Sequence, residues 1–272
     1  MFEKIFENLT IIKPVVHCIT NFVTVNDCAN IILACGGSPT MAHHKDEVEE
    51  ITSNSKSLVL NMGTLFDVDS MIAAGKKSNE LNNPVIIDPV GMGASTLRNN
   101  TFEKLEGNIR FSVIRGNISE IKHIATGEGS TSGVDADELD MITENNVADI
   151  VGMAKSLSSK LNCVIAISGP IDIVADRNKA YIIRNGHPIM AKITGSGCMS
   201  TALIGAFCGA NPGNILDATA AAVASIGVCG ELAQKKMEKT EGGTMTFRMY
   251  LIDYISNMTS EMINKEIKIE TL

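Results

Sequence analysis

The chain has 272 residues, of which 44% are hydrophobic and only 4% aromatic, so a core of aliphatic side chains is expected. Its net charge is −8 and its pI is near 5.2, and it contains no basic stripe of the kind that phosphate backbones or anionic membranes require. These values argue against binding to nucleic acid or to a membrane surface. The seven cysteines include no Cys-x-x-Cys pair, which is typical of buried thiols in a reducing compartment.

Two further features predict a cytoplasmic protein. Glu3 and Lys4 interrupt the first residues, which is unlike the apolar core of a signal peptide. The longest uncharged apolar run, residues 218–230, is shorter than the roughly 20 residues that span a membrane.

The first predicted element is a helix. Apolar residues recur at helical spacing at Phe22, Val25, Ala29, Ile32 and Leu33, and two glycines, 36 and 37, end the pattern. The strands that follow are predicted from short apolar runs at 58–60, 84–88, 111–114 and 163–167.

Helices are predicted between these strands. One opens at Asp67, whose side chain can cap it, and a longer one covers 147–161 with apolar residues on one face. An antiparallel hairpin at the edge of the sheet is predicted from 172–176 and 179–183. After Gly195 the pattern is helical to the end, with a final amphipathic helix over 247–258.

Strands that alternate with helices predict an α/β fold with a mostly parallel central sheet and helices on both faces. We find no linker, repeat or change of composition, and therefore predict one domain over residues 1–272.

Polar, Gly-containing segments follow four of the predicted strands, beginning at Asn61, Asp88, Arg115 and Ser168. Ligands bind at the carboxyl ends of strands in open α/β sheets, so four such segments predict a shared site along one edge.

The segment Gly195-Ser196-Gly197-Cys198 precedes an apolar helix. Amides at the start of that helix would bind an anion, although the segment also fits an ordinary Gly-rich turn. Asp88 at a strand end is suited to Mg²⁺ or to a plain Asp-Pro turn. Asn117 and Glu120 can face the same way, either toward a ligand or as a capping box.

Six segments of the chain, in order, match the pattern of a known family. They are Val16-His17-Cys18-Ile19-Thr20-Asn21-Phe22-Val23-Thr24, Gly37-Ser38-Pro39-Thr40-Met41-Ala42, Asn61-Met-Gly-Thr-Leu65, Asp88-Pro-Val-Gly91, Arg115-Gly-Asn-Ile-Ser-Glu120 and Gly195-Ser-Gly-Cys198. Together these segments resemble the hydroxyethylthiazole kinases. The resemblance covers the whole chain. It implies a ribokinase-like fold, transfer of the γ-phosphoryl group of ATP to the hydroxyl of 4-methyl-5-(2-hydroxyethyl)thiazole, Mg²⁺, and a homotrimer with active sites between subunits.

The resemblance also implies roles for individual residues. Asn21, Met41, Gly63 and Gly195 would bind the thiazole, with Asn21 and Met41 opposite the Cys198 of a partner subunit. Arg115, Asn117 and Ser168 would bind ATP, Asp88 and Glu120 would hold the metal, and Gly195, Ser196 and Gly197 would form the anion hole. Cys198 would be catalytic, as an acceptor or an orienter of the hydroxyl proton.

Two positions depart from the family pattern. Cys18 stands where Asn is expected, which changes one contact on the thiazole side, and Ser168 stands where Thr is common, which preserves the hydroxyl. Most ribokinase-like enzymes have an Asp base at the position of Cys198. Because a helix N-terminus lowers the pKa of a thiol, we expect a thiolate at Cys198 near neutral pH.

Three alternatives stay open from the sequence: a hydroxymethylpyrimidine kinase, a cysteine hydrolase that pairs Cys198 with His17, and a non-catalytic nucleotide-binding protein. The Cys at 198, in place of Asp, argues against the first. Dependence on ATP separates a kinase from the hydrolase, and a turnover assay separates it from the binding protein.

Overall fold

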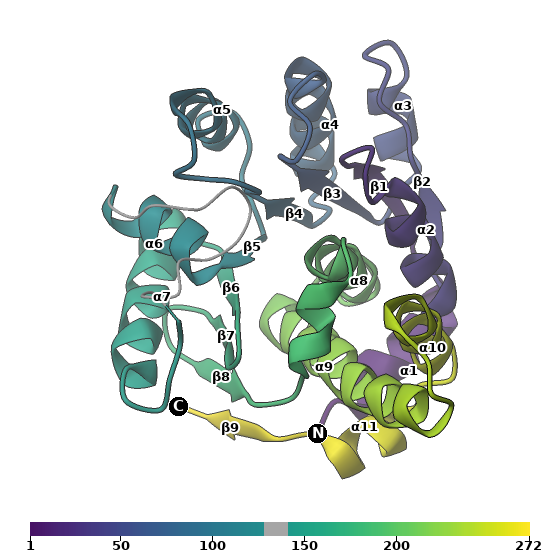
Figure 1. Ribbon diagram of the computed structural model, residues 1–272. Helices are drawn as coiled ribbons and strands as arrows, with labels where there is room; N and C mark the ends of the chain where they lie inside the picture. Colours follow the sequence, from purple (N-terminus) through teal and green to yellow (C-terminus); the bar gives the residue numbers. More distant parts are fainter. Residues whose placement is uncertain (128–140) are drawn as a thin grey trace.

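The computed structural model describes residues 1–127 and 141–272, and in these residues the strands form one nine-stranded sheet of order β2-β1-β3-β4-β5-β6-β7-β8-β9 (Figure 1). The strands are β1 Val15–Ile19, β2 Ser38–Thr40, β3 Ser57–Asn61, β4 Val85–Asp88, β5 Val113–Asn117, β6 Val164–Ser168, β7 Asp172–Ala175, β8 Ala180–Ile183 and β9 Ile269–Thr271. Strands β1 to β6 are parallel, and β7, β8 and β9 continue the sheet in antiparallel pairing.

Helices cover both faces of the sheet, as predicted (Figure 1). On one face lie α3 Val48–Ser53, α4 Val68–Glu80, α5 Thr96–Glu106, α6 Ile118–Thr126 and α7 Val147–Leu161. On the other lie α1 Glu3–Ile12, α2 Val25–Ala34, α8 Ser196–Ala210, α9 Ile215–Lys239, α10 Thr244–Ser256 and α11 Ser260–Glu266, with the short 3₁₀ helix η2 Pro188–Lys192 before α8.

The pleat of the strands explains this two-sided core. In β3, Leu58 and Leu60 pack toward α4, whereas Val59 between them packs toward α8. Because both faces are covered, the central strands are apolar at successive positions, which is why the sequence pattern there is continuous.

The helix α9 is long and apolar enough to cross a membrane by length and composition, and it is the one such helix among the described residues. Of its apolar window, 78% is buried inside the protein. Its residues Ala218 to Gly230 pack against α8, α10 and the antiparallel strands, so the composition of α9 is that of a core helix.

Several sequence predictions need correction. The chain continues beyond α10 into α11 and β9, and β9 pairs with β8, so the hairpin β7–β8 is not the edge of the sheet. Asp67 precedes α4 but its side chain makes no cap. In α2 the buried face carries Cys28, Ile31 and Ile32, whereas Leu33 is 58% exposed.

Candidate active site

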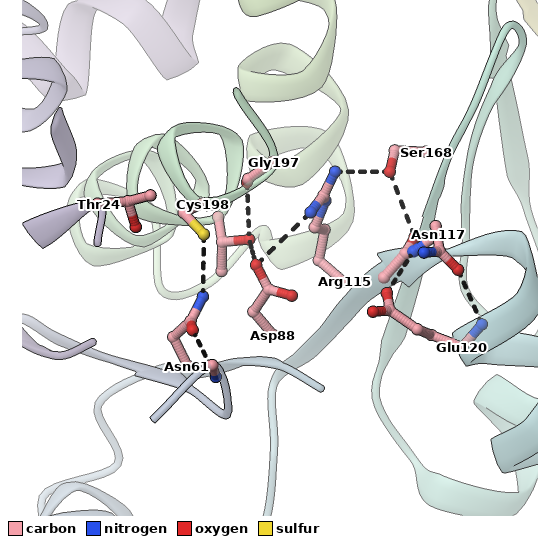
Figure 2. Close-up of polar contacts among 12 residues, drawn as sticks. Thr24, Asn61, Asp88, Arg115, Asn117, Glu120, Ser168, Gly197 and Cys198 are labelled. Atoms are coloured by element: carbon pink, nitrogen blue, oxygen red, sulfur yellow. Dashed lines mark hydrogen bonds and ion pairs between the residues drawn. The ribbon is translucent and has the colours of Figure 1, made fainter. Parts of the chain in front are cut away.

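The polar residues predicted from the sequence lie together at one edge of the sheet. Asn61, Asp88, Asn117 and Ser168 are the last residues of β3, β4, β5 and β6. Parallel strands end at the same edge, and the segment 195–198 reaches that edge because α8 begins there and packs on β1, β3 and β4. Figure 2 shows these side chains directed toward one another across the strand ends.

Cys198 in the first turn of α8 is the centre of a buried polar cluster. Its Sγ accepts hydrogen bonds from Nδ2 of Asn21 at 3.4 Å and from Nδ2 of Asn61 at 3.3 Å. Asn21 Nδ2 also donates to Asn61 Oδ1 at 3.0 Å. The amide of Gly63 donates to the same Oδ1 at 2.8 Å, and a Cβ on Gly63 would lie 2.8 Å from the Cβ of Asn21. The cluster therefore joins Cys198 to Asn21 and Gly63, two of the predicted thiazole residues.

This cluster corrects the prediction that Asn21 lies opposite the Cys198 of a partner subunit, because the two side chains touch within one chain. Asn21 closely follows β1, and α8 packs on β1 and β3, so the fold itself brings the two residues together. Met41 follows β2 and packs against the core on the face that α8 covers.

Burial, followed by the negative charge of Asp88, raises the pKa of the Cys198 thiol. Hydrogen bonds with Thr24 and Asn21 and the charge of Arg115 act in the opposite direction and are weaker. The predicted thiolate near neutral pH is therefore wrong. The sequence shows that Cys198 lies at a helix start. It does not show that Asp88 lies near the thiol or that the thiol is buried.

Gly195 is the N-cap of α8 and has a φ of 89°, which favours glycine. A Cβ at this position would also lie 2.8 Å from Cγ2 of Thr24. The first backbone bond into α8 runs from Met199 N to Gly195 O at 2.8 Å, so the amides of residues 196–198 are those that an α-helix leaves open at its start. These three amides can bind an anion.

Arg115, on β5, lies between this helix start and the strand ends. Its Nη2 donates to Ser168 Oγ at 2.5 Å, and its Nη1 lies 3.5 Å from Asp88 Oδ2. The same Oδ2 accepts a hydrogen bond from Thr201 Oγ1 at 2.7 Å. A Cβ on Gly197 would be 2.7 Å from Arg115 Nη1, so the guanidinium group occupies the space that this glycine leaves open (Figure 2).

The Nε of Arg115 is buried without a hydrogen-bond partner within the described residues. A buried unpaired donor beside a helix start that binds anions is suited to an anionic ligand.

Glu120 and Asn117 form a capping box at the start of α6. Glu120 Oε2 accepts from Asn117 N at 2.8 Å, and Asn117 Oδ1 accepts from Glu120 N at 2.9 Å. Glu120 Oε1 accepts from Gly91 N at 2.8 Å, in the turn that follows β4. Burial, and next the charge of Asp88, raise the pKa of Glu120 to about 7. The two carboxyl groups are thus held near each other in a low dielectric.

A cleft of about 520 Å³ extends from Arg115 and Ser168 between the β6–β7 turn, the start of α8 and the middle of α9. Its lining includes Ala166, Ile167, Asp172, Met190, Val223 and Ile226. Sequence analysis missed most of these residues, because an apolar side chain on α9 has the same pattern whether it lines a cleft or fills the core. Burial also raises the pKa of the Asp172 carboxyl in this cleft to about 7.

His17 and Cys18 on β1 do not contribute to the polar cluster. The ring of His17 is buried and bonds through Nδ1 to Thr52 Oγ1 at 2.8 Å and through Nε2 to Ala42 O at 3.0 Å. Both nitrogens are therefore engaged away from Cys198, which argues against the cysteine hydrolase. Cys18 is buried in the core beneath α8, where desolvation raises the pKa of its thiol.

The fold is of the ribokinase-like class. A ribokinase-like superfamily protein from Enterococcus faecalis V583 superposes with a TM-score of 0.60 at 13% sequence identity, over 93% of this chain and 88% of that one. At this identity the likeness concerns the fold alone.

The chain belongs to the hydroxyethylthiazole kinase family, whose model matches residues 6–261. It is 48% identical to a hydroxyethylthiazole kinase from Clostridium acetobutylicum, over 100% of both chains. The structure of a hydroxyethylthiazole kinase from Pyrococcus horikoshii OT3 superposes with a TM-score of 0.86 at 29% identity, over 100% of this chain and 98% of that one.

Proposed function

We propose that the protein transfers the γ-phosphoryl group of ATP to the hydroxyl of 4-methyl-5-(2-hydroxyethyl)thiazole, in the cytoplasmic salvage or biosynthesis of thiamine. The observation that carries this proposal is the position of Cys198. It lies at a helix start that can hold phosphates, and it also contacts Asn21 and Asn61, beside the predicted thiazole pocket. Membership of the family supplies the identity of the alcohol.

The nucleotide would enter the cleft of about 520 Å³. Its apolar walls suit the face of a purine base, and its inner end opens on Arg115, Ser168 and Gly197. There the open amides of residues 196–198 at the start of α8 and the guanidinium of Arg115 would surround the phosphates, with Asn117 at the end of β5. The charge that develops on the transferring phosphoryl oxygens would be stabilised by these fixed donors.

The carboxylates fit a magnesium ion. Asp88 uses Oδ2 for its contacts with Thr201 and Arg115, which leaves Oδ1 as the oxygen directed to a further ligand. Burial raises the pKa of both Asp88 and Glu120. The positive groups of the protein therefore do not fully balance the negative charge of these two carboxylates. Mg²⁺ is commonly held by one or two carboxylates together with substrate phosphates. When bound, the ion would neutralise charge on the β- and γ-phosphate oxygens.

The acceptor hydroxyl would lie beside Cys198 Sγ. The Nδ2 donors of Asn21 and Asn61 fix the position of the sulfur, so that Sγ is directed at the hydroxyl proton. The P–O bond to ADP breaks as the bond to the alcohol oxygen forms, and in our proposal the proton of that alcohol passes to Sγ in the small fraction of the protein that holds Cys198 as a thiolate, which becomes the neutral thiol. Since phosphoryl transfer is loose, proton removal comes late and a weakly ionised base suffices.

We also propose that residues 1–272 form one domain that assembles as a homotrimer with active sites between subunits. One continuous sheet supports the single domain. An apolar patch beside the acceptor cluster supports the assembly: Phe22, Val23 and Phe66 are 59%, 75% and 86% exposed. The rings of Phe22 and Phe66 stack 6.5 Å apart. Exposed apolar patches of this kind mark protein interfaces.

Light scattering tests the assembly. A Phe66→Asp variant should shift the protein toward the monomer and lose activity in parallel, while Leu97→Asp, at another exposed apolar residue, should do neither. A fully active monomeric wild type would refute the intersubunit site.

A coupled ADP-release assay over a panel of alcohols tests the activity. Turnover is expected with the thiazole alcohol and to require both ATP and Mg²⁺. Clear turnover of hydroxymethylpyrimidine without turnover of the thiazole alcohol would favour the pyrimidine kinase, and absence of turnover with every alcohol would favour a binding protein.

A further inference from the structure

Arg98, in the first turn of α5, lies beneath two turns that border the active site. Its Nη1 donates to Val90 O at 2.7 Å and to the carbonyl oxygen of Met62. Its Nη2 reaches Gly63 O at 3.5 Å. The side chain is half-buried and comes from a helix that contributes none of the active-site residues described above. One guanidinium group thus joins the turn after β3 to the turn after β4.

Each of these turns carries part of the proposed chemistry. The first contains Gly63, which packs on Asn21 and bonds to Asn61, at the acceptor side. The second contains Gly91, whose amide donates to Glu120 Oε1 on the metal side. Gly91 has a φ of 73°, and a Cβ there would lie 3.0 Å from Cδ of Arg98, so the backbone of this turn rests on the arginine side chain.

The sheet alone does not fix the two turns relative to each other. Its ladder between β3 and β4 ends with the bond from Met62 N to Asp88 O at 2.9 Å. The residues beyond that bond, including Gly63 and Val90, belong to two separate connections, one leading to α4 and the other to α5. The fork of a guanidinium group holds several carbonyl oxygens in fixed geometry, which an ammonium group on a flexible stem does not.

We propose that Arg98 is a positioning residue for phosphoryl transfer, which fixes the acceptor-side turn at Gly63 relative to the metal-side turn at Gly91. The proposal rests on the proposed function, since it assigns the two turns to the alcohol and to the metal. Small displacements of the reacting groups lower the rate of transfer strongly, because transfer needs the alcohol oxygen in line with the phosphorus atom.

The proposal predicts a specific defect. Without Arg98 the γ-phosphoryl group is still activated, but the alcohol is held less well, and water competes as the acceptor. In both reactions the P–O bond to ADP breaks. The new bond forms to the alcohol oxygen in one case and to a water oxygen in the other, and each acceptor loses one proton. An alcohol that is poorly positioned relative to the γ-phosphoryl group is therefore detected as ADP formed in excess of thiazole phosphate.

The test measures ADP and thiazole phosphate together in wild type, Arg98→Ala and Arg98→Lys. The wild-type ratio should be near one. In Arg98→Ala, kcat for thiazole phosphate should fall by about tenfold to 10²-fold and the ratio should rise above one, with KM for ATP unchanged. Both kcat and the ratio of ADP to thiazole phosphate in Arg98→Lys should lie between those of wild type and Arg98→Ala. Added guanidinium chloride at millimolar concentration should partly restore kcat and the ratio of Arg98→Ala. Arg177→Ala, at an exposed arginine in the β7–β8 turn, is the matched control and should match wild type.

A ratio that stays at one in folded Arg98→Ala and Arg98→Lys, with kcat reduced only as far as the folded fraction falls, would overturn the positioning role. If Arg98→Ala does not fold, Arg98→Lys decides by the same ratio. A wild-type protein that forms no thiazole phosphate would contradict the proposed function instead, which keeps the two failures apart.

Discussion

The variant Cys198→Asp tests whether the side chain at this position accepts the proton of the alcohol. A thiol with the ordinary pKa of about 8.5 is only about 3% ionised at pH 7. Burial and the charge of Asp88 raise the pKa of Cys198, so its ionised fraction is smaller still. An aspartate at the same place meets the same burial and the same Asp88 charge, but its ordinary pKa is only about 3.9, so its ionised fraction at pH 7 exceeds that of the thiol by at least about 30-fold.

The aspartate is also a weaker base than the thiolate. The pKa values of the two bases differ by over four units. With a Brønsted coefficient of about 0.5, the rate constant for proton transfer to the aspartate is about 10²-fold lower than to the thiolate. The two effects nearly cancel, so we expect kcat of Cys198→Asp at pH 7 to remain within about tenfold of wild type. Cys198→Ala has no base and should lose about 10²-fold to 10⁴-fold in kcat, with little change in KM for ATP.

The pH profile provides the sharper assay. The kcat of wild type should rise with pH through the range 6.5 to 9, because deprotonation of a thiol with a raised pKa supplies the base. The kcat of Cys198→Asp should be flat over that range. An Ala variant with unchanged kcat, or a wild-type profile as flat as that of Asp, would refute the role of Cys198 as proton acceptor. Melting temperatures of both variants separate a loss of stability from a loss of chemistry.

Three further variants test the site and the packing of the helices around it. Gly197→Ala should displace the Arg115 guanidinium, since the new Cβ would lie 2.7 Å from Nη1, and should lower kcat/KM for ATP by about 10-fold to 10²-fold; Gly152→Ala on α7, where a Cβ meets open space, is the control. Because the pKa of Glu120 is raised to about 7, the metal-free protein should lose stability as pH rises from about 4.5 through 7, and Mg²⁺ or Glu120→Gln should flatten this dependence in thermal melts. Asp27→Ala should lower Tm strongly, because it leaves Arg248 without the buried carboxylate that joins α2 to α10; Asp69→Ala, in an exposed ion pair, should not.

The fold was largely predictable because the parallel strands are buried on both faces. Val85 to Ile87 in β4 form a continuous apolar run, which a covered parallel strand requires. Strands β1, β2 and β9 escaped prediction. The side chains of β2 and β9 are mostly exposed or half-buried and carry no pattern, and the apolar run of the buried strand β1 is short and interrupted by His17. Leu33 was misplaced because apolar spacing locates a helix but does not reveal which residues face solvent.

The location of the site was predictable for a similar reason. Asp88 ends β4 and Ser168 ends β6, and these parallel strands have only β5 between them. Topology alone therefore places both residues on one edge of the sheet. The chemical state of Cys198 was not predictable, because it depends on Asp88, which is distant in the sequence. The role of Arg98 likewise depends on three carbonyl groups from two other turns, and a single arginine in a helix carries no such signal.

A competition experiment distinguishes a thiazole kinase from a pyrimidine kinase in one reaction. The protein is incubated with ATP, Mg²⁺ and an equimolar mixture of 4-methyl-5-(2-hydroxyethyl)thiazole and hydroxymethylpyrimidine, and the phosphorylated products are resolved by mass spectrometry. Our account predicts thiazole phosphate as the main product, formed in equal amount to ADP. Pyrimidine phosphate as the main product, or ADP without either phosphate ester, would contradict it.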